Sequence, residues 1–398
     1  MPQDTTLYRK YRPQQLEDIV GQEHVTKTLR NAFLNENLPH AFLFAGPRGC
    51  GKTTTAKILA KLVNCSNPQN GEPCNQCNNC ISTDNGSNPD IVEMDAASNR
   101  GIENMRELTS KVDLKPSYGE YRVYIIDEVH MLTTESFNAL LKTLEEPPTS
   151  VIFILATTEI NKVIGTITSR CQTHNFKRIS IHDIATLLEK VAKSEGNILV
   201  DRSGAEAIAS NSGGSLRDAL GKIQQLKDYA GGNEITQEVV NEYLGVTNNS
   251  VLGNMLDLIL TKDINAILSF VNRADRDGVD IGQLMIDFEE YLRKVWMLSI
   301  DQKNSEIFYS SEKELDRLVK QASELSPKNS LMYIEILEES MAKLSTNAIP
   351  RILFETCLTK MAYPEMDNGP VGIKAQLNKM DKKLTQLEMI LAFFKNKE

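Results

Sequence analysis

The segment that most constrains the fold is a glycine-rich stretch at residues 46–53, GPRGCGKT, which matches the pattern G-x-x-x-x-G-K-[ST]. An apolar run at 41–45 precedes it and a helical pattern over 54–62 follows it. Strand, loop and helix therefore stand in the order of a phosphate-binding loop, in which backbone N–H groups surround the phosphates. We predict that Lys52 reaches the β- and γ-phosphates and that Thr53 ligates Mg²⁺. The predicted nucleotide-binding residues are Gly46, Pro47, Arg48, Gly49, Cys50, Gly51, Lys52, Thr53 and Thr54.

Short apolar runs alternate with helical patterns through the first part of the 398-residue chain. They are bounded by Gly, Pro, Asn or charged residues and lie at 41–45, 91–94, 123–126 and 151–156, with a weaker run at 171–176. Such continuously apolar runs are typical of strands buried on both sides. Their alternation with helices predicts an α/β fold, in which a mainly parallel sheet carries helices on both faces.

Beyond about residue 180 the strand-like runs stop and the pattern becomes helical. Helices are expected over 181–194, 204–211 and 216–229, before glycine- and asparagine-rich breaks. A chain of this length should hold two or three domains. We expect an α/β domain at 1–179 with a metal module at 65–80, a small helical domain at 180–244, an all-helical domain at 245–366, and a C-terminal linker and amphipathic helix at 367–398.

The expected C-terminal helix carries a row of apolar residues at alternating spacings of four and three. The row consists of Ile373, Leu377, Met380, Leu384, Leu387, Leu391 and Phe394. This spacing forms a heptad seam. Because the seam lasts only about three heptads, two interpretations stay open: packing against the chain's own helical domain, and pairing with a partner.

Two acidic residues follow the apolar run 123–126. Asp127 comes at the end of this expected strand, where a carboxylate can hold the Mg²⁺ of a nucleotide bound at the glycine-rich loop. Glu128 points elsewhere and can orient or activate the attacking water. Because Lys52, Asp127 and Glu128 are all present, we predict nucleotide hydrolysis as well as binding.

Four of the seven cysteines lie close together, with the spacing Cys65-x8-Cys74-x2-Cys77-x2-Cys80. Four thiolates complete a tetrahedron around one ion and leave no position for water, so we predict a structural Zn²⁺ site. In the bacterial iron–sulfur pattern, C-x2-C-x2-C is followed by a fourth cysteine and a proline. Here Asp84 lies in that region, and the fourth cysteine, Cys65, lies upstream. Free thiols or a redox pair are the alternatives.

The net charge, the length of the apolar runs and the N-terminal sequence indicate where the protein is found and what it does not bind. The net charge of −9 argues against a general coat for nucleic acid, because phosphate binding depends on Lys and Arg. The apolar runs are far shorter than the roughly 20 residues of a membrane span. The N-terminus lacks the basic start and apolar core of a secretory signal. We therefore expect a cytoplasmic protein without membrane contact.

Eight motifs, taken together, resemble those of the gamma/tau subunits of bacterial DNA polymerase III. Besides the glycine-rich loop and the cysteine cluster, they are YRKYRP at 8–13, VGQEHV at 20–25, DEVHML at 127–132, LEEPP at 144–148, SRC at 169–171 and GSLRDA at 214–219. The resemblance runs from residue 8 to about 230. Beyond 245 it is limited to a helical region of suitable length.

This resemblance implies an AAA+ ATPase with a zinc-binding insertion, a helical lid and an all-helical collar. In the family, such a subunit is a motor of the clamp loader, which uses ATP to open the ring-shaped sliding clamp and place it on primed DNA. The implied partners are the other clamp-loader subunits in a ring-like hetero-oligomer, the clamp, and primed DNA held by its backbone. The subunit is part of the polymerase holoenzyme but has no polymerase active site of its own.

The resemblance also implies roles for residues outside the loop. Tyr11, Arg12, Val20 and Gly21 are expected to border the adenine. Thr158 resembles a sensor that contacts the γ-phosphate from the end of a strand.

Two arginines receive roles in the same way. Arg217 resembles a second sensor, which the lid carries back to the phosphates of its own chain. Arg170 resembles an arginine finger that acts in trans, on the nucleotide of the adjacent subunit, where a guanidinium offsets charge in the transition state. A surface arginine before a strand is the alternative for Arg170.

Two other functions stay open at this stage. Another AAA+ motor that remodels DNA, such as a branch-migration helicase, would share the glycine-rich loop but not the cysteine insertion. A nucleotide-binding scaffold without hydrolysis is disfavoured by Lys52, Asp127 and Glu128. The sequence leaves open the subunit stoichiometry, self-assembly, and the polymerase and helicase contacts of the longer tau-type members.

Overall fold

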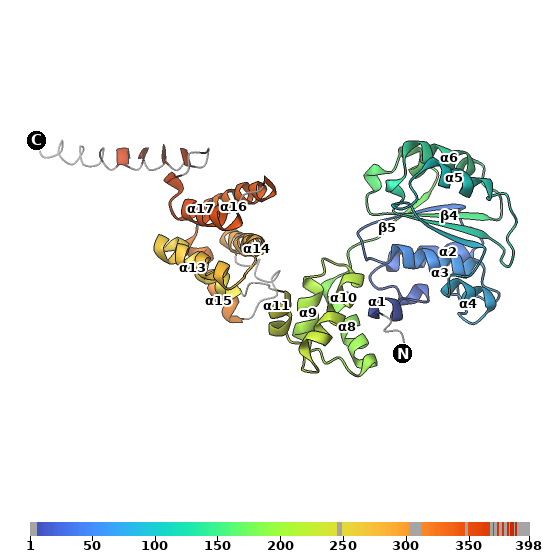
Figure 1. Cartoon of the computed structure of the whole chain (residues 1–398), viewed down its shortest axis with the longest axis horizontal. Helices are drawn as coiled ribbons and strands as arrows, with labels where there is room; N and C mark the ends of the chain where they lie inside the picture. The colour runs from blue at the N-terminus through green and yellow to red at the C-terminus, as the bar shows by residue number, and fades with distance from the viewer. Residues whose placement is uncertain are drawn as a thin grey trace, which may run out of the picture. The chain divides into compact units, whose positions relative to one another are not determined.

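The computed structural model describes residues 6–244, 249–301, 312–346, 349–366, 369, 372–373, 376–377, 380–381, 383–385 and 387. The chain divides into two compact units, Met1–Val240 and Asn241–Glu398 (Figure 1). Within the described ranges, no helix is long and apolar enough to cross a membrane. The predicted α/β region, 1–179, falls in the first unit, as does the first predicted helical region, 180–244, except for its last four residues.

A parallel sheet forms the centre of the first unit. Its five strands in the described residues have the order β2-β3-β4-β1-β5. They are β1 (Ala41–Ala45), β2 (Ile91–Asp95), β3 (Arg122–Asp127), β4 (Val151–Thr157) and β5 (Gln172–Asn175). Each of the five apolar runs thus forms a strand, and the predicted α/β class is confirmed.

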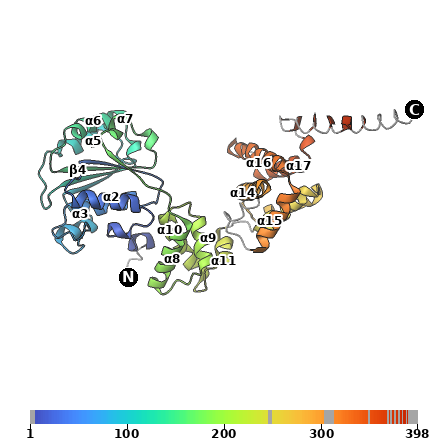
Figure 2. The same ribbon diagram turned by 180° about the vertical axis from the view of Figure 1, so that it is seen from behind.

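Helices cover both faces of this sheet (Figure 2). On one face, α2 (Glu23–Leu34) and α3 (Lys52–Val63) pack against side chains such as Phe42 and Ile125. On the other face, α5 (Ile102–Ser110) and α6 (Thr134–Glu145) pack against the alternate side chains, such as Leu43 and Tyr124. Because successive side chains of a strand point to opposite faces, one apolar run supplies both cores.

The two edge strands depart from the prediction that the strands are buried on both sides. Strands β1 and β4 are buried along their whole length, whereas Glu93 of β2 is exposed and Ile91 is half-buried. In β5 only His174 is buried. An edge strand has a neighbour on one side only, so fewer elements cover it.

The remaining helices of the first unit surround the sheet or follow it. They are α1 (Leu7–Lys10), α4 (Asn78–Asp84), α7 (Gly165–Thr168), α8 (Ile181–Glu195), α9 (Arg202–Ser210) and α10 (Leu216–Ala230), with short 3-10 turns η1 (Leu16–Asp18), η2 (Val129–Met131) and η3 (Ile160–Lys162). Helices α8, α9 and α10 begin within two residues of the predicted positions. Each starts at a polar cap, Ser180, Asp201 or Ser215, whose side chain accepts a backbone N–H bond.

The second unit is helical in its described residues. Its helices are α12 (Asn249–Leu260), α13 (Ile264–Arg276), α14 (Ile281–Ile300), α15 (Glu312–Glu324), α16 (Pro327–Ala342) and α17 (Pro350–Ala362), with turns η5 (Lys343–Thr346) and η6 (Pro364–Met366); α11 (Gln237–Leu244) spans the boundary. Phe288 of α14 and Phe354 of α17 meet edge to face in its core. This unit therefore has a hydrophobic core of its own.

The heptad seam is only partly described. Its first five members, Ile373, Leu377, Met380, Leu384 and Leu387, are each more than half exposed. Leu391 and Phe394 lie outside the described residues. The five described side chains are therefore not part of the buried core of the second unit, and neither interpretation of the seam is decided by this exposure.

Candidate nucleotide site

A cleft of about 640 Å³ lies in the first unit where β1 and β3 end. The carboxyl ends of parallel strands are where open α/β sheets bind their ligands. Most of the predicted site residues line this cleft. They are Tyr11, Arg12, Val20, Arg48, Gly49, Cys50, Gly51, Lys52, Thr53, Thr54, Asp127, Glu128 and Arg217.

The predicted residues outside the cleft lining are Gly21, Gly46, Pro47, Thr158 and Arg170. Gly46 and Pro47 belong to the same loop, and their carbonyl groups bind Lys52. Gly21 has a positive φ of 74°, and a side chain there would contact Ile179. Gly21 therefore shapes the chain next to the cleft.

The glycine-rich loop has a backbone that only glycine adopts without strain. Gly46, Gly49 and Gly51 have φ values of 152°, 73° and 105°. A Cβ atom on Gly49 would lie 1.9 Å from the Ser215 hydroxyl oxygen, and the Leu216 N–H donates to the Gly49 carbonyl at 3.1 Å. The loop and the start of α10 are thus in direct contact.

Lys52 lies at the first position of α3 and is buried. Its ammonium group donates to the carbonyl oxygens of Gly46 and Pro47, both at 2.8 Å. A buried ammonium requires such partners, because an unpaired buried charge is costly. The lysine is therefore held inside the loop, at the place where phosphate oxygens would bind.

Thr53 and Asp127 meet across the cleft although 74 residues separate them. The Thr53 hydroxyl donates to Asp127 Oδ2 at 2.7 Å. A hydroxyl and a carboxylate are the oxygen ligands that Mg²⁺ takes beside nucleotide phosphates. These two side chains fit the predicted magnesium site.

Glu128 has an unusual backbone conformation, with φ of 50° and ψ of 45°. Its carboxylate accepts hydrogen bonds from the Thr158 hydroxyl at 3.0 Å and the Thr158 N–H at 3.4 Å. His130 Nδ1 lies 3.4 Å from the same oxygen and 2.9 Å from the Thr157 hydroxyl. Thr158 is thus joined to the cleft through Glu128, and His130 is a neighbour that sequence reasoning did not single out.

The YRKYRP motif, residues 8–13, forms another wall of the cleft. Arg12 donates from Nε to the Thr54 hydroxyl at 3.2 Å, and burial lowers the pKa of its guanidinium. Tyr8 and Arg9, which the sequence predictions missed, line the cleft beside Tyr11. All of them belong to the YRKYRP motif at 8–13, and that motif was the signal for the two missed residues.

Arg217 comes from α10 and lines the cleft. Its guanidinium carbon lies 5.1 Å from the centre of the Tyr8 ring, which is within the range of a cation–π contact. The backbone N–H of Leu7 also donates to Gln224 of α10 at 3.0 Å. Residues 7 and 8 therefore contact α10 at two places.

Arg170 lies apart from the cleft of its own chain. Its guanidinium donates to Glu145 at 2.5 Å and to the Thr166 carbonyl at 2.7 Å. Its side chain is one third exposed. Arg170 is thus available to a neighbouring molecule and is held by one carboxylate.

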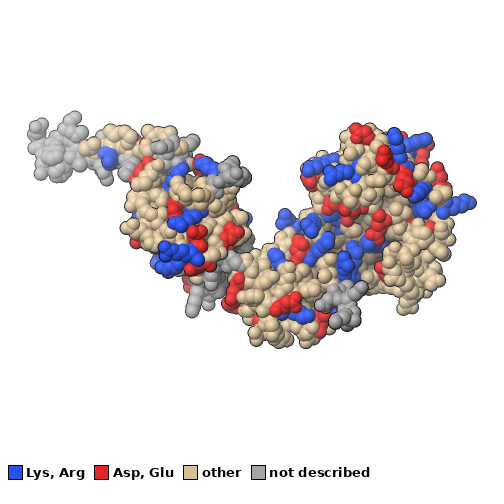
Figure 3. Space-filling model, viewed as in Figure 1, with Lys and Arg blue, Asp and Glu red and all other residues tan. Residues whose placement is uncertain are grey.

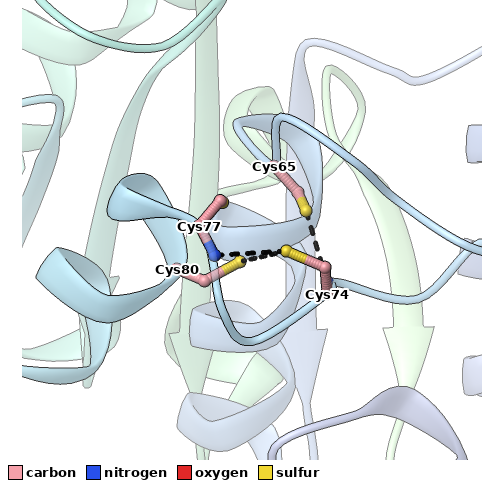
Figure 4. A group of neighbouring side chains, drawn as sticks. All are labelled: Cys65, Cys74, Cys77 and Cys80. Atoms are coloured by element: carbon pink, nitrogen blue, oxygen red, sulfur yellow. Dashed lines mark hydrogen bonds between the residues drawn. The ribbon is translucent and has the colours of Figure 1, made fainter.

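The four clustered cysteines lie side by side (Figure 4). Their sulfur atoms all fall within 4.8 Å of one another, and those of Cys74 and Cys80 are 3.9 Å apart. Zinc–sulfur bonds of about 2.3 Å place four sulfurs roughly 3.8 Å apart in a tetrahedron. All seven cysteines are free thiols, so the donor set fits one Zn²⁺ ion held by Cys65, Cys74, Cys77 and Cys80.

The surroundings favour a thiolate within this cluster. Burial acts to raise the pKa of the Cys77 thiol, but hydrogen bonds from the Ser66 and Cys80 backbone and from the neighbouring thiols lower it to about 6. Burial raises the pKa of the Cys80 thiol. A thiolate is the form that ligates a metal. Cys50 and Cys357, outside the cluster, are buried.

Charges of both signs are mixed on the surface. On the face drawn in Figure 3, basic and acidic side chains alternate over the described residues and neither sign covers a continuous area. This mixture agrees with the net charge of −9. No broad basic coat for nucleic acid is seen on that face.

Two family models match the chain in different regions. Residues 21–180 match a family described as DNA polymerase III, delta subunit. Residues 235–369 match a family described as DNA polymerase III subunits gamma and tau domain III. The first match covers the sheet and the cleft, and the second covers most of the helical unit.

Two relatives match along nearly the whole chain. DNA polymerase III subunit tau of Bacillus subtilis is 39% identical over 383 residues, which are 96% of this chain and 67% of that protein. DNA polymerase III subunit gamma of Buchnera aphidicola is 34% identical over 371 residues, 92% of this chain and 99% of that protein. The chain therefore spans about two thirds of the tau subunit and nearly all of the gamma subunit.

Among solved structures, the RuvB Holliday junction branch migration motor of Thermotoga maritima is 22% identical, with a TM-score of 0.44. That match covers 68% of this chain and 86% of RuvB.

Proposed function

The chain belongs to the family of bacterial DNA polymerase III gamma and tau subunits, and from this premise we propose that it is an ATP-hydrolysing motor of a clamp loader. The resemblance drawn from its motifs is confirmed by this membership. The motor binds ATP with Mg²⁺ in the cleft of the first unit. Hydrolysis drives the opening of a ring-shaped sliding clamp and its placement on primed DNA.

The observation that carries the proposal is the meeting of Lys52, Thr53, Asp127 and Glu128 at one end of the sheet. Lys52 binds the β- and γ-phosphates. Thr53 and Asp127 hold the Mg²⁺, which neutralises charge on the phosphate oxygens when bound. Glu128 is the group that orients or activates the attacking water, and Thr158 holds its carboxylate.

For the domains, the proposal keeps the boundaries expected from the sequence. The α/β ATPase domain covers 1–179, the lid 180–244 and the collar 245–366. The lid carries Arg217, which reaches the phosphates as the second sensor. Tyr11, Arg12, Val20 and Gly21 border the adenine.

Arg170 acts in trans in this proposal. Its guanidinium lies outside the cleft lining of its own chain and is one third exposed. A finger delivered to the neighbouring subunit's ATP makes hydrolysis depend on assembly. The chain thus works in a hetero-oligomer with other clamp-loader subunits, which contacts the clamp and the backbone of primed DNA, in the cytoplasm.

The test is the steady-state ATPase rate of the full chain, alone and with the sliding clamp, primed DNA and the other loader subunits. We expect a low basal rate that rises strongly in the full mixture. Arg170→Ala should lower that stimulated rate by about 10³-fold or more and leave ATP binding unchanged.

Glu145→Gln is the matched control for this experiment, because it removes the ion-pair partner of Arg170 and keeps the finger. Stimulation in the Glu145→Gln protein should persist. A rate that is indifferent to clamp and subunits would overturn the clamp-loader role and favour another motor. The absence of any turnover would favour a scaffold.

A further inference from the structure

Two buried charges near the nucleotide cleft take no part in the proposed hydrolysis. The side chain of Lys61, on α3, is 2% exposed, and Glu72 is 7% exposed. Glu72 lies between Cys65 and Cys74, in the loop that the cysteines enclose. A buried charge is costly unless it is paired. The partners of Lys61 and Glu72 therefore show which segments these two side chains connect.

Lys61 joins the cysteine module, defined here as residues 65–84, to the N-terminal segment, residues 11–20. Its ammonium group donates to Gln14 Oε1 at 2.6 Å and to Asp84 at 2.9 and 3.2 Å. Asp84 is the last residue of α4, the helix that carries Cys80. Gln14, Lys61 and Asp84 all line the nucleotide cleft.

Glu72 makes a second connection between the same two segments. One of its carboxylate oxygens accepts the backbone N–H of Leu16 at 2.6 Å, and the other pairs with Arg30 of α2. The cysteine module therefore has two connections to the N-terminal segment. Lys61 joins Asp84 to Gln14, and Glu72 binds Leu16 directly.

The N-terminal segment has little regular structure of its own. Apart from the turn η1, residues 11–20 form neither helix nor strand, so side-chain contacts determine where the segment lies. Leu16 and Ile19 anchor it in the core, while the bonds from Glu72 and Lys61 fix the part next to Arg12. Four metal–thiolate bonds would close the loop that contains Glu72 and would fix α4, which carries both Cys80 and Asp84.

We propose that the cysteine module is a positioning element for the nucleotide site, which holds the N-terminal segment against the cleft through Glu72 and the Lys61–Asp84 pair. The inference rests on the proposed ATP site. It assigns to the module a role in nucleotide affinity, with Glu72 and Asp84 as positioning residues that act through Leu16 and Lys61.

The first test measures the binding of a fluorescent ATP analogue to the full chain. Glu72→Gln and Asp84→Asn each remove a charge and keep the size of the side chain. Together they should weaken binding about tenfold, while the zinc content stays at that of the wild type. Glu107→Gln, which breaks an exposed ion pair with Lys111 on α5, is the matched control and should change nothing.

The second test removes zinc from the wild-type chain with a chelator. Binding should weaken by a similar factor, and amide hydrogen exchange should accelerate in residues 11–20. In the Glu72→Gln/Asp84→Asn protein, chelation should add little further loss, because coupled sites are not additive. The hydrogen-exchange measurement uses the wild-type chain, so it does not depend on the folding of the variants.

Lys52→Ala separates the two proposals. If Lys52→Ala leaves binding intact, the proposed ATP site itself is wrong. If Lys52→Ala abolishes binding, but neither zinc removal nor the two substitutions change affinity or exchange in residues 11–20, the positioning role is overturned.

Discussion

Glu128 adopts a left-handed backbone conformation although it is not a glycine. Such a conformation costs of the order of 1–3 kcal/mol and persists only where the surroundings enforce it. Here the bonds from Thr158 and the contact with His130 hold the carboxylate. This backbone conformation brings the Glu128 carboxylate to Thr158 at the end of β4, where it lines the cleft.

Glu128→Gln should reduce ATP hydrolysis by about 10²–10⁴-fold, because an amide cannot act as a base toward water. ATP binding should persist, since Lys52, Thr53 and Asp127 are unchanged. Single-turnover hydrolysis and nucleotide binding measure the two effects separately. Glu120→Gln, at an exposed position, should behave as wild type. Equal loss of binding and hydrolysis would contradict the role of Glu128.

Gly49→Ala tests the contact between the glycine-rich loop and the start of α10. The added Cβ would lie 1.9 Å from the Ser215 hydroxyl oxygen, so we expect a lower melting temperature and weaker ATP binding. Gly86→Ala is the matched control, because Gly86 has a similar φ of 67° but nothing within 4 Å of its Cβ position. Both variants carry the left-handed strain of about 1–2 kcal/mol. Equal effects on melting would show that the contact with Ser215 is unimportant.

At the scale of elements, α3 runs between the nucleotide cleft and the cysteine cluster of the first unit. Its first turn contributes Lys52 and Thr53 to the nucleotide cleft, and the chain just beyond its last residue contributes Cys65 to the cysteine cluster. Lys61 lies between them and binds Asp84 of α4. In the proposed positioning role, this helix of 12 residues connects the cysteine module to the cleft.

Cys77→Ser should reduce bound zinc from one ion per chain to nearly none, because a serine hydroxyl is a poor replacement for a thiolate in a four-sulfur site. Metal analysis of the purified protein measures this loss. Cys171→Ser is the control, since Cys171 lies outside the cluster. The Cys171→Ser protein should keep its zinc. Full zinc occupancy in the Cys77→Ser protein would refute the four-cysteine site.

At the scale of the whole molecule, each of the two compact units has its own hydrophobic core. Phe42 and Leu43 belong to the cores of the first unit, and Phe288 and Phe354 belong to the core of the second. Units with separate cores can unfold separately. The cleft belongs entirely to the first unit.

Calorimetry of the full chain should therefore show two unfolding transitions. ATP with Mg²⁺ should raise only the transition of the first unit, because ligand binding stabilises the unit that binds it, by about 2.7 kcal/mol at a ligand concentration 100 times the Kd. ADP without Mg²⁺ is the comparison, and it should raise the unfolding temperature of the first unit by less. A single transition, or an equal rise in both, would mean that the two units unfold together.

The sequence alone determined the features that are local in the chain. The glycine-rich loop between an apolar run and a helix, the acids after the run 123–126, and the spacing of the cysteines each lie within a few tens of residues. Strand and helix periodicity is local as well, so the α/β class and the starts of α8 and α10 followed from it. These are the parts of the fold that the pattern of side chains specifies directly.

Only the tertiary structure decided which distant side chains meet. Glu72 binds Leu16 across 56 residues, and Leu7 binds Gln224 across 217. The pairing of Arg170 with Glu145 and the strained backbone of Glu128 also arise from packing. No local pattern encodes such contacts, because chain segments far apart in sequence come together only when the strands pair and the helices cover the sheet.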